Sequence, residues 1–151
     1  LHRDKIGRCI LMNDQTITLY NYHTVSKTWH RTVIHGVSYR YGSERTVSSS
    51  GAIVYTQLLT VIIPADADTD GKDYIDAGAY SGLRQSAADD FWTINPMKNH
   101  DVIVCGEVNK KISDSYTITD LQRDYQKSGT VCSMSDNTDV PMLKHYKVVC
   151  K

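Results

Sequence analysis

The sequence has few of the residues that mark helical, membrane or nucleic-acid-binding proteins. Only two of its 151 residues are Glu and seven are Ala, although both residues favour helices. No apolar run approaches the about 18 residues of a membrane span, and the longest, 58–64, is interrupted by Thr60. The formal net charge is zero, whereas general nucleic-acid binders are usually basic. We therefore expect a globular protein that neither crosses membranes nor binds nucleic acid generally.

The cysteines show no pattern of a metal or redox motif. The four residues lie far apart and form no C-x-x-C pair; they are Cys9, Cys105, Cys132 and Cys150. We see no secretory signal sequence, so we expect free thiols in a reducing compartment. Cys105 and Cys150 lie inside apolar, strand-like segments, which predicts small core residues rather than reactive thiols.

The residues that are abundant favour β-structure. Val, Ile and Thr number 39 together, against 15 for Leu and Ala, and there are ten Tyr. β-Branched and aromatic side chains fit a pleated sheet, and the 15 Asp residues favour turns. Because 151 residues suit one domain, we predict a mainly β fold, a single small β-barrel or sandwich spanning residues 12–151. Residues 1–11 precede Met12 and the first strand, and we interpret them as an extension or a disordered N-terminus.

The pattern of apolar residues predicts six strands and one short helix. Residues 16–22 and 29–37 alternate and predict a hairpin, and 48–51 (SSSG) predict a mobile link. The expected strands are 16–22, 29–37, 52–63, 101–108, 130–135 and 144–150, with a turn at 136–141. A helix is predicted over 119–127, with Thr119 as its N-cap and Gly129 at its end.

Charge is distributed unevenly along the chain. Residues 65–92 hold seven acidic and two basic residues, a net charge of −5, whereas residues 1–47 carry +4. We predict that 65–92 is a long inserted acidic loop with a functional role. Its acidic residues are Asp66, Asp68, Asp70, Asp73, Asp76, Asp89 and Asp90. The basic front, Arg31, Arg40 and Arg45, is expected to be a solvated face that can complement the acidic loop of a neighbouring copy.

One local pattern suggests a cation. Asp66, Asp68 and Asp70 alternate and are followed by Gly71, which is how calcium loops place oxygen ligands. The twelfth position of such a loop should be Glu, but here it is Ala77. The three aspartates are therefore weak calcium candidates, and a solvated acidic turn is the simpler interpretation.

The remaining chemical side chains suggest structural roles. His23, His30 and His35 are expected at the surface or at strand edges rather than in a zinc site, and Trp29 and Trp92 in the core or over an edge. The pair Asp89–Asp90 has no apolar pocket in view that would separate two carboxyl pKa values. The sequence contains no nucleophile-elbow, phosphate-loop or dinucleotide-binding motif. We therefore predict a protein that is not an enzyme and needs no cofactor.

From Met12 onward several segments follow one another in a recognisable order, and no single motif carries the pattern. The segments are residues 16–22, 29–36, 61–64, 66–74, 92–93, 101–107, 133–137 and 145–148. In this order they resemble a family of small proteins of tailed phages and prophages of Gram-positive bacteria. The sequence departs from the family pattern at 95–100, where Pro96 and Met97 replace the usual turn.

The resemblance implies a head-tail connector of the head-completion or stopper type. Proteins of that type are small β-barrels with a long inserted loop, and they assemble into rings. The implied partners are further copies of the chain, portal or adaptor proteins, and tail-terminator proteins, with DNA passing through the channel without specific binding. The implied location is the virion, assembled in the bacterial host cytoplasm. An acidic loop lining such a channel would repel phosphate and help DNA to slide.

Three other interpretations stay open. Within phages, the chain could be a tail-side completion protein or a minor virion protein. From a different class comes a calcium-assisted β-sandwich binding module that uses Asp66, Asp68 and Asp70. The third is a cysteine or metal hydrolase, for which Cys105 has no recognisable partner in the sequence.

Overall fold

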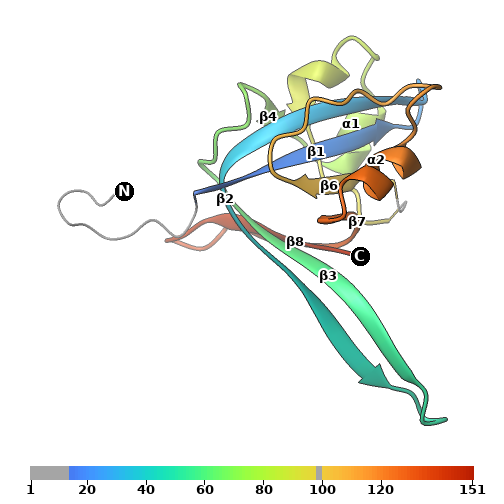
Figure 1. The fold of residues 1–151 in the computed structure, drawn as a ribbon. Helices are drawn as coiled ribbons and strands as arrows, with labels where there is room; N and C mark the ends of the chain where they lie inside the picture. The colour runs from blue at the N-terminus through green and yellow to red at the C-terminus, as the bar shows by residue number, and fades with distance from the viewer. Residues whose placement is uncertain (1–13, 98–99) are drawn as a thin grey trace.

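The computed structural model describes residues 14–97 and 100–151, and it confirms a mainly β fold. Six strands close into a barrel in the order β1-β2-β3-β8-β7-β6, and each neighbouring pair is antiparallel. Figure 1 shows the barrel with a long hairpin projecting from it. The strands are β1 (Gln15–His23), β2 (Thr28–Val47), β3 (Ile53–Pro64), β6 (Val102–Cys105), β7 (Ser128–Asn137) and β8 (His145–Cys150).

The interior of the barrel is filled by alternate residues of these strands. Ile17 and Leu19 of β1, Val61 and Ile63 of β3, and Ile103 of β6 are all fully buried in one cluster. Successive side chains of a strand point to opposite faces, so the alternation in the sequence places these residues on the inner face. The predicted alternation of the first strand is therefore confirmed.

A second, smaller core lies outside the barrel wall. Tyr20, Val102 and Val104 face outward from β1 and β6, and they pack with Val108 and Leu121. Leu121 belongs to α2 (Ile118–Asp124), which covers this side of the barrel. This cluster explains why β6 is apolar on both faces.

The predicted helix exists, but its start and its end were wrong. The N-cap of α2 is Thr117 rather than Thr119; its hydroxyl accepts from the Asp120 backbone amide, and the Asp120 side chain bonds back to the Thr117 amide. This capping box satisfies two backbone amides that would lack partners. The helix ends with Tyr125 as its C-cap, before Gly129, so it is shorter than the sequence pattern suggested.

Residues 65–92 are not a structureless loop. They contain β4 (Asp73–Tyr74), α1 (Ala77–Ser81), the 3-10 helix η1 (Ala88–Asp90) and β5 (Phe91–Trp92), with β4 and β5 paired in parallel. Trp92 is buried in the main core, and Tyr74 packs against it at 4.9 Å between ring centroids. These two aromatic residues fix the segment over one end of the barrel, which the acidic composition did not reveal.

Candidate functional site

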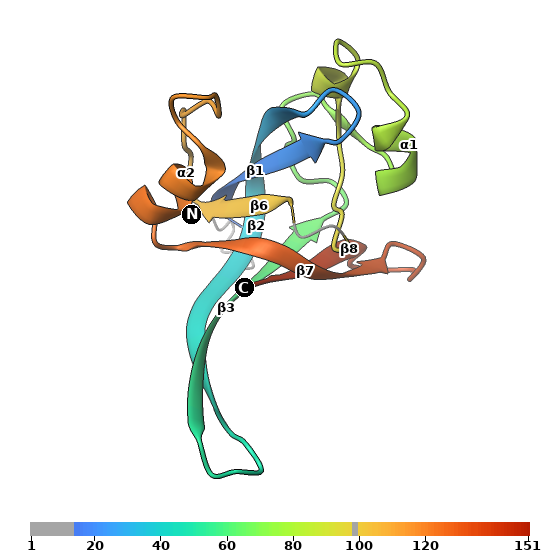
Figure 2. The same ribbon diagram turned by 90° about the vertical axis from the view of Figure 1, so that its right-hand side faces the viewer.

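The most prominent feature is the hairpin formed by the far ends of β2 and β3, residues 42–58, here called the arm. Figures 1 and 2 both show it leaving the barrel on the side away from α1 and β4. Residues 38–47 pair with residues 53–62 without a register shift. The predicted link 48–51 is the turn of the arm, where Gly51 has a φ of +88° and its amide donates to the Ser48 carbonyl. Sequence analysis ended the second strand at residue 37, so it missed the arm.

One face of the arm continues the inner face of the barrel. Val47 pairs with Ile53 and Arg45 with Tyr55, and these positions have the same parity as the buried Leu59. Outside the barrel nothing in the described chain covers them: Val47 is 62% exposed, Ile53 53% and Tyr55 70%. Val47, Ile53 and Tyr55 are called the apolar face of the arm. The alternation that buries side chains inside the barrel thus continues along the part of the hairpin that solvent surrounds.

An arm of this kind gains stability from a partner. A two-stranded ribbon alone is marginally stable in water, and its unpaired edges are templates for further pairing. Burying one Val, Ile or Leu side chain completely is worth about 1.5–3 kcal/mol. Covering the apolar face would therefore contribute several kcal/mol to an association.

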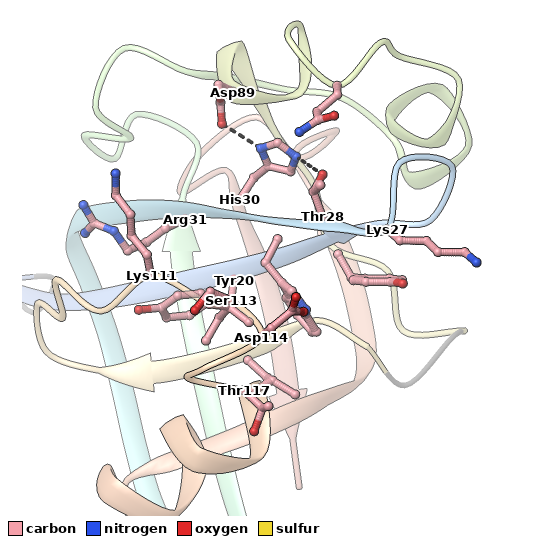
Figure 3. A pocket seen from close by; sticks show the side chains of 15 residues that line it. Tyr20, Lys27, Thr28, His30, Arg31, Asp89, Lys111, Ser113, Asp114 and Thr117 are labelled. Atoms are coloured by element: carbon pink, nitrogen blue, oxygen red, sulfur yellow. Dashed lines mark hydrogen bonds and ion pairs between the residues drawn. The ribbon is translucent and has the colours of Figure 1, made fainter.

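The second feature is a groove of about 820 Å³ on the outside of the barrel. Its floor is the β1–β2 hairpin, where Tyr22 and Trp29 stack at 4.9 Å between ring centroids. Asp89 lies on one wall and Ser113 and Asp114 on the other, as Figure 3 shows. The groove therefore joins the acidic segment to the loop that precedes α2.

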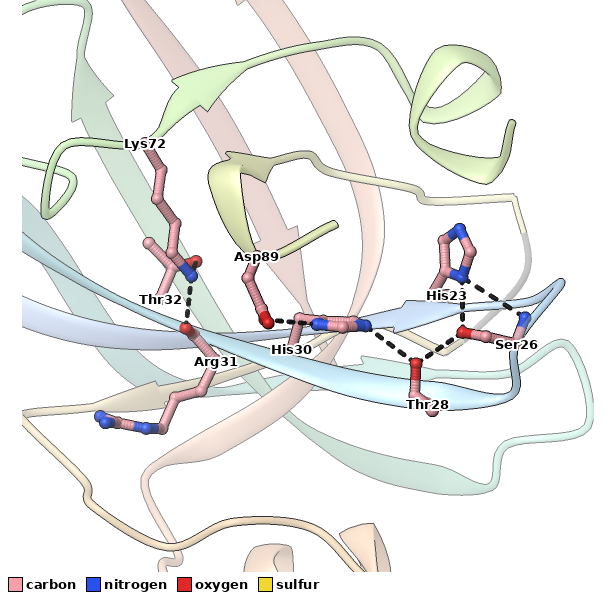
Figure 4. A network of polar contacts seen from close by, with 8 residues as sticks. All are labelled: His23, Ser26, Thr28, His30, Arg31, Thr32, Lys72 and Asp89. Atoms are coloured by element: carbon pink, nitrogen blue, oxygen red, sulfur yellow. Dashed lines mark hydrogen bonds and ion pairs between the residues drawn. The ribbon is translucent and has the colours of Figure 1, made fainter. Parts of the chain in front are cut away.

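A chain of hydrogen bonds runs along β2 from the groove, as Figure 4 shows. His30 Nδ1 lies 2.6 Å from Asp89 Oδ1, and His30 Nε2 lies 2.9 Å from Thr28 Oγ1. Thr28 Oγ1 contacts Ser26 Oγ at 2.6 Å, which contacts His23 Nδ1 at 2.6 Å. The His30 side chain is 6% exposed and that of Asp89 is 69% exposed. A buried imidazole therefore holds a surface carboxylate of the acidic segment.

The direction of this chain depends on His30, because each hydroxyl has only one proton to donate. When Nδ1–H of His30 donates to Asp89 and Nε2 is unprotonated, Thr28 donates to His30, Ser26 donates to Thr28, and His23 must donate from Nδ1. When both ring nitrogens of His30 carry protons, the bonds between His30 Nε2 and His23 reverse and His23 Nδ1 accepts, whereas His30 Nδ1 still donates to Asp89. His23 Nε2 is buried and has no partner within the described chain. The Ser26 amide also donates to His23 Nδ1, at 3.4 Å, which is the direction in which Nδ1 accepts.

Further contacts hold the acidic segment to the barrel. Lys72 Nζ donates to the Arg31 carbonyl at 2.7 Å and to Thr32 Oγ1 at 3.0 Å. Burial lowers the pKa of Lys72, although Asp89 is among the carboxylates that oppose the shift. Asp68 forms an antiparallel bridge with His35 through two backbone hydrogen bonds. The segment is therefore attached to β2 at three points along its length.

A buried carboxylate fixes the exit of the segment. Asp101 accepts hydrogen bonds from the Tyr22 amide at 3.0 Å, the Asn95 amide at 2.9 Å and Asn21 Nδ2 at 3.0 Å. These donors lower the pKa of Asp101, but burial acts more strongly and raises it to about 6. Asp101 thereby ties β1 to Asn95, next to Pro96. Of the stretch 95–100, Lys98 and Asn99 lie outside the described residues.

The seven aspartates predicted as an interface loop are all exposed. Only some have a local structural role: Asp76 caps α1, and Asp68 Oδ1 accepts from the Asp70 amide at 3.1 Å. Within residues 14–97 and 100–151, no three His, Cys, Asp or Glu side chains are grouped so that they could hold a metal ion. The calcium candidates Asp66, Asp68 and Asp70 therefore gain no support from the geometry. The acidic residues instead form a charged surface at one end of the barrel.

The three arginines predicted as a basic face lie apart. Arg31 lines the groove and donates from Nη1 to the Val108 carbonyl at 2.8 Å. Arg40 lies at the base of the arm and Arg45 near its tip. Because their positions differ in parity, Arg40 and Arg45 point to opposite faces of the ribbon. The basic residues therefore belong to two features, the groove and the arm.

The histidines were predicted at the surface, and this was wrong for two of them. His23 and His30 are buried beneath the acidic segment, where Tyr80 packs edge-on against both rings. Strand parity places them on the inner face, and the segment that covers them is distant in sequence. Of these three histidines, only His35 is exposed. The sequence did hold one signal: His30 and Ile34 are four positions apart on the same strand, so the His30 side chain points to the same inner face as this core residue.

The cysteine and tryptophan predictions fit the structure. Cys105, Cys132 and Cys150 are free thiols, and Cys9 lies outside the described residues. Burial raises the pKa of Cys105 to about 11 and that of Cys150 further, which disfavours the reactive thiolate. Trp92 is a core residue, and Trp29 is partly buried against the outer cluster.

A family model matches residues 12–151, nearly the whole chain, and it describes a family of unknown function, DUF6751. The chain belongs to this family. No curated protein and no solved structure matches the chain. In the described part of this family member, no helix is long and apolar enough to cross a membrane.

Proposed function

We propose that this member of DUF6751 is a non-enzymatic structural subunit that assembles with copies of itself through the arm. The observation that carries the proposal is the apolar face of the arm, a core-like surface held in solvent by the last six of the ten β2–β3 residue pairs, in unbroken register. Such a surface is costly for a free monomer, because it favours aggregation. It is accounted for if another copy covers it.

The arrangement of charge supports association in one direction. The arm leaves the barrel on the side opposite the acidic segment 65–92, as both ribbon views show. Arg45 lies near the tip of the arm, and the segment carries a net charge of −5. Two different surfaces at opposite ends make a head-to-tail contact, which generates a ring where the rotation closes.

The proposed place of this ring is the head-tail junction of a tailed phage, as a head-completion or stopper protein of the virion. The support is the sequence resemblance described above together with a small barrel that carries a long projection. In such a ring the portal or adaptor lies on one side and the tail terminator on the other. Aspartates that face the channel would repel DNA phosphates, so that DNA slides without binding.

The deciding experiment uses DNA-filled heads that lack this protein. The purified chain should cosediment with the heads and stop DNA leakage. The variant Val47→Ser/Ile53→Ser should fail to do both, because it removes two of the three side chains of the apolar face, whereas Val54→Ser on the opposite face should behave as wild type. Binding to tails alone would transfer the proposal to the tail-side completion role. Binding to neither, or full activity of the double variant, would refute assembly through the arm.

A further inference from the structure

We infer that the groove on the outside of the barrel is the receptor for the arm of the next copy. This inference rests on the proposed function, since it names the surface that covers the arm in the assembly. It makes the arm and the groove the two halves of one repeated interface.

The apolar surfaces of the two features match in chemistry. The groove is floored by Tyr22 and Trp29 and bordered by Ile112, all of which are partly exposed. The end of the arm presents Ile53 and Tyr55. Aromatic side chains on a rigid floor are the usual anchors of protein interfaces, and a volume of about 820 Å³ is within the range that encloses several side chains.

The charged side chains that line the groove determine where Arg45 of the arm would lie. Asp89 and Asp114 are both exposed and stand on opposite walls, whereas Arg31 and Lys111 lie together at one end of the groove (Figure 3). Arg45 is the cross-strand neighbour of Tyr55. Lys27 lines the opposite end of the groove, so Arg45 pairs with the two aspartates only when it lies between the walls, away from both cationic ends. Tyr55 is then placed over the aromatic floor.

The position of the groove keeps a copy from filling it with its own arm. The acidic segment, which forms one wall, lies at the end of the barrel away from the arm. From Gly42 to Val47 the arm spans roughly 17 Å at about 3.3 Å per residue. One copy therefore cannot easily fill its own groove, and each copy retains a vacant groove for the next.

Photocrosslinking from the arm tests the inference directly. Tyr55 is replaced by benzoylphenylalanine, the chain is assembled in solution or on heads, and crosslinked peptides are identified in a mixture of isotopically light and heavy copies. We expect light-to-heavy crosslinks to peptides that contain Trp29 or residues 106–118. The same probe at Val54, on the opposite face, should give none of these. Assembly with crosslinks only elsewhere would overturn the inference and leave the proposed function intact; absence of any assembly would refute both.

Mixing two defective variants provides an independent measurement. Ile53→Ser/Tyr55→Ser removes the arm contact and Asp114→Arg reverses a groove charge, so each alone should be monomeric by sedimentation velocity and absent from heads. Together they retain one good arm and one good groove, and should form a one-to-one dimer that does not grow. Asp139→Arg, the same change outside the groove, should assemble as wild type. Assembly of Asp114→Arg like that control would overturn the inference.

Discussion

Asp101 should make the stability of this protein depend on pH in a direction opposite to that of most carboxylates. Burial raises its folded-state pKa from 3.8 to about 6, so between these values the folded state binds more protons than the unfolded state. Its contribution to stability is therefore fully present below the unfolded pKa and is lost as the pH rises through the folded pKa. A shift of two units corresponds to about 3 kcal/mol of unfolding free energy.

The substitution Asp101→Asn isolates this effect. Asparagine cannot titrate, and it keeps only one acceptor oxygen, so those of the Tyr22, Asn95 and Asn21 donors that face its NH2 group lose their acceptor. We expect the difference in unfolding free energy between wild type and variant to change by about 3 kcal/mol between about pH 4 and about pH 7. Urea unfolding followed by tryptophan fluorescence over a pH series measures this difference.

Exposed carboxylates provide the control for this experiment. Hydrogen bonds lower the pKa of Asp136, so its contribution is lost as the pH falls, the opposite sign to that of Asp101. Such contributions are the same in the wild type and in Asp101→Asn, so they cancel when the two unfolding free energies are subtracted. Asp139→Asn, an exposed site, should leave the pH dependence unchanged. A constant difference between wild type and Asp101→Asn across the series would refute the reasoning.

Other predictions concern packing and capping, and urea unfolding checks each of them. A Cβ atom at Gly129 would lie 2.8 Å from the Cys150 Cβ, so Gly129→Ala should lower stability by about 1–3 kcal/mol; an unchanged midpoint would contradict the close approach of the two strands. Thr117→Ala should lower stability by about 1 kcal/mol through loss of the helix cap, whereas Thr119→Ala should have little effect; equal effects would argue against the capping box. Leu121→Ala should lower stability by about 2–5 kcal/mol because Leu121 is fully buried, and a smaller loss would mean that the outer cluster contributes little.

The sequence was most informative where the local pattern and the tertiary environment agreed. The alternation around Ile17 and Leu19 and the apolar stretch ending at Pro64 predicted strands, and both lie in the barrel. The helix near Leu121 was also predicted, although its cap was placed two residues too late. The choice between Thr117 and Thr119 depends on backbone angles at the helix start, which residue spacing does not determine.

The arm was missed because its first strand carries the signal of a loop, although its second strand lies within the predicted strand 52–63. Residues 38–46 are mostly polar, with Gly42 and Ser43 in the middle, and a strand that lies outside the core has no buried face to impose alternation. Its pairing comes from the register that β2 and β3 already have inside the barrel. The apolar pairs at its end could be recognised only once that register was known.

The candidate site, like the arm, could be recognised only once the tertiary structure was known. The sequence identified 65–92 as an acidic segment, and composition alone predicted the mainly β fold that the structure shows. The sequence did not show that Asp89 would meet His30 at 2.6 Å or that the loop before α2 would form the second wall of a groove, because those residues are separated by dozens of positions. Local patterning determines strands and turns through side-chain periodicity. Only closure of the barrel, which orders the strands and places the segment over one end, decides which distant side chains come together.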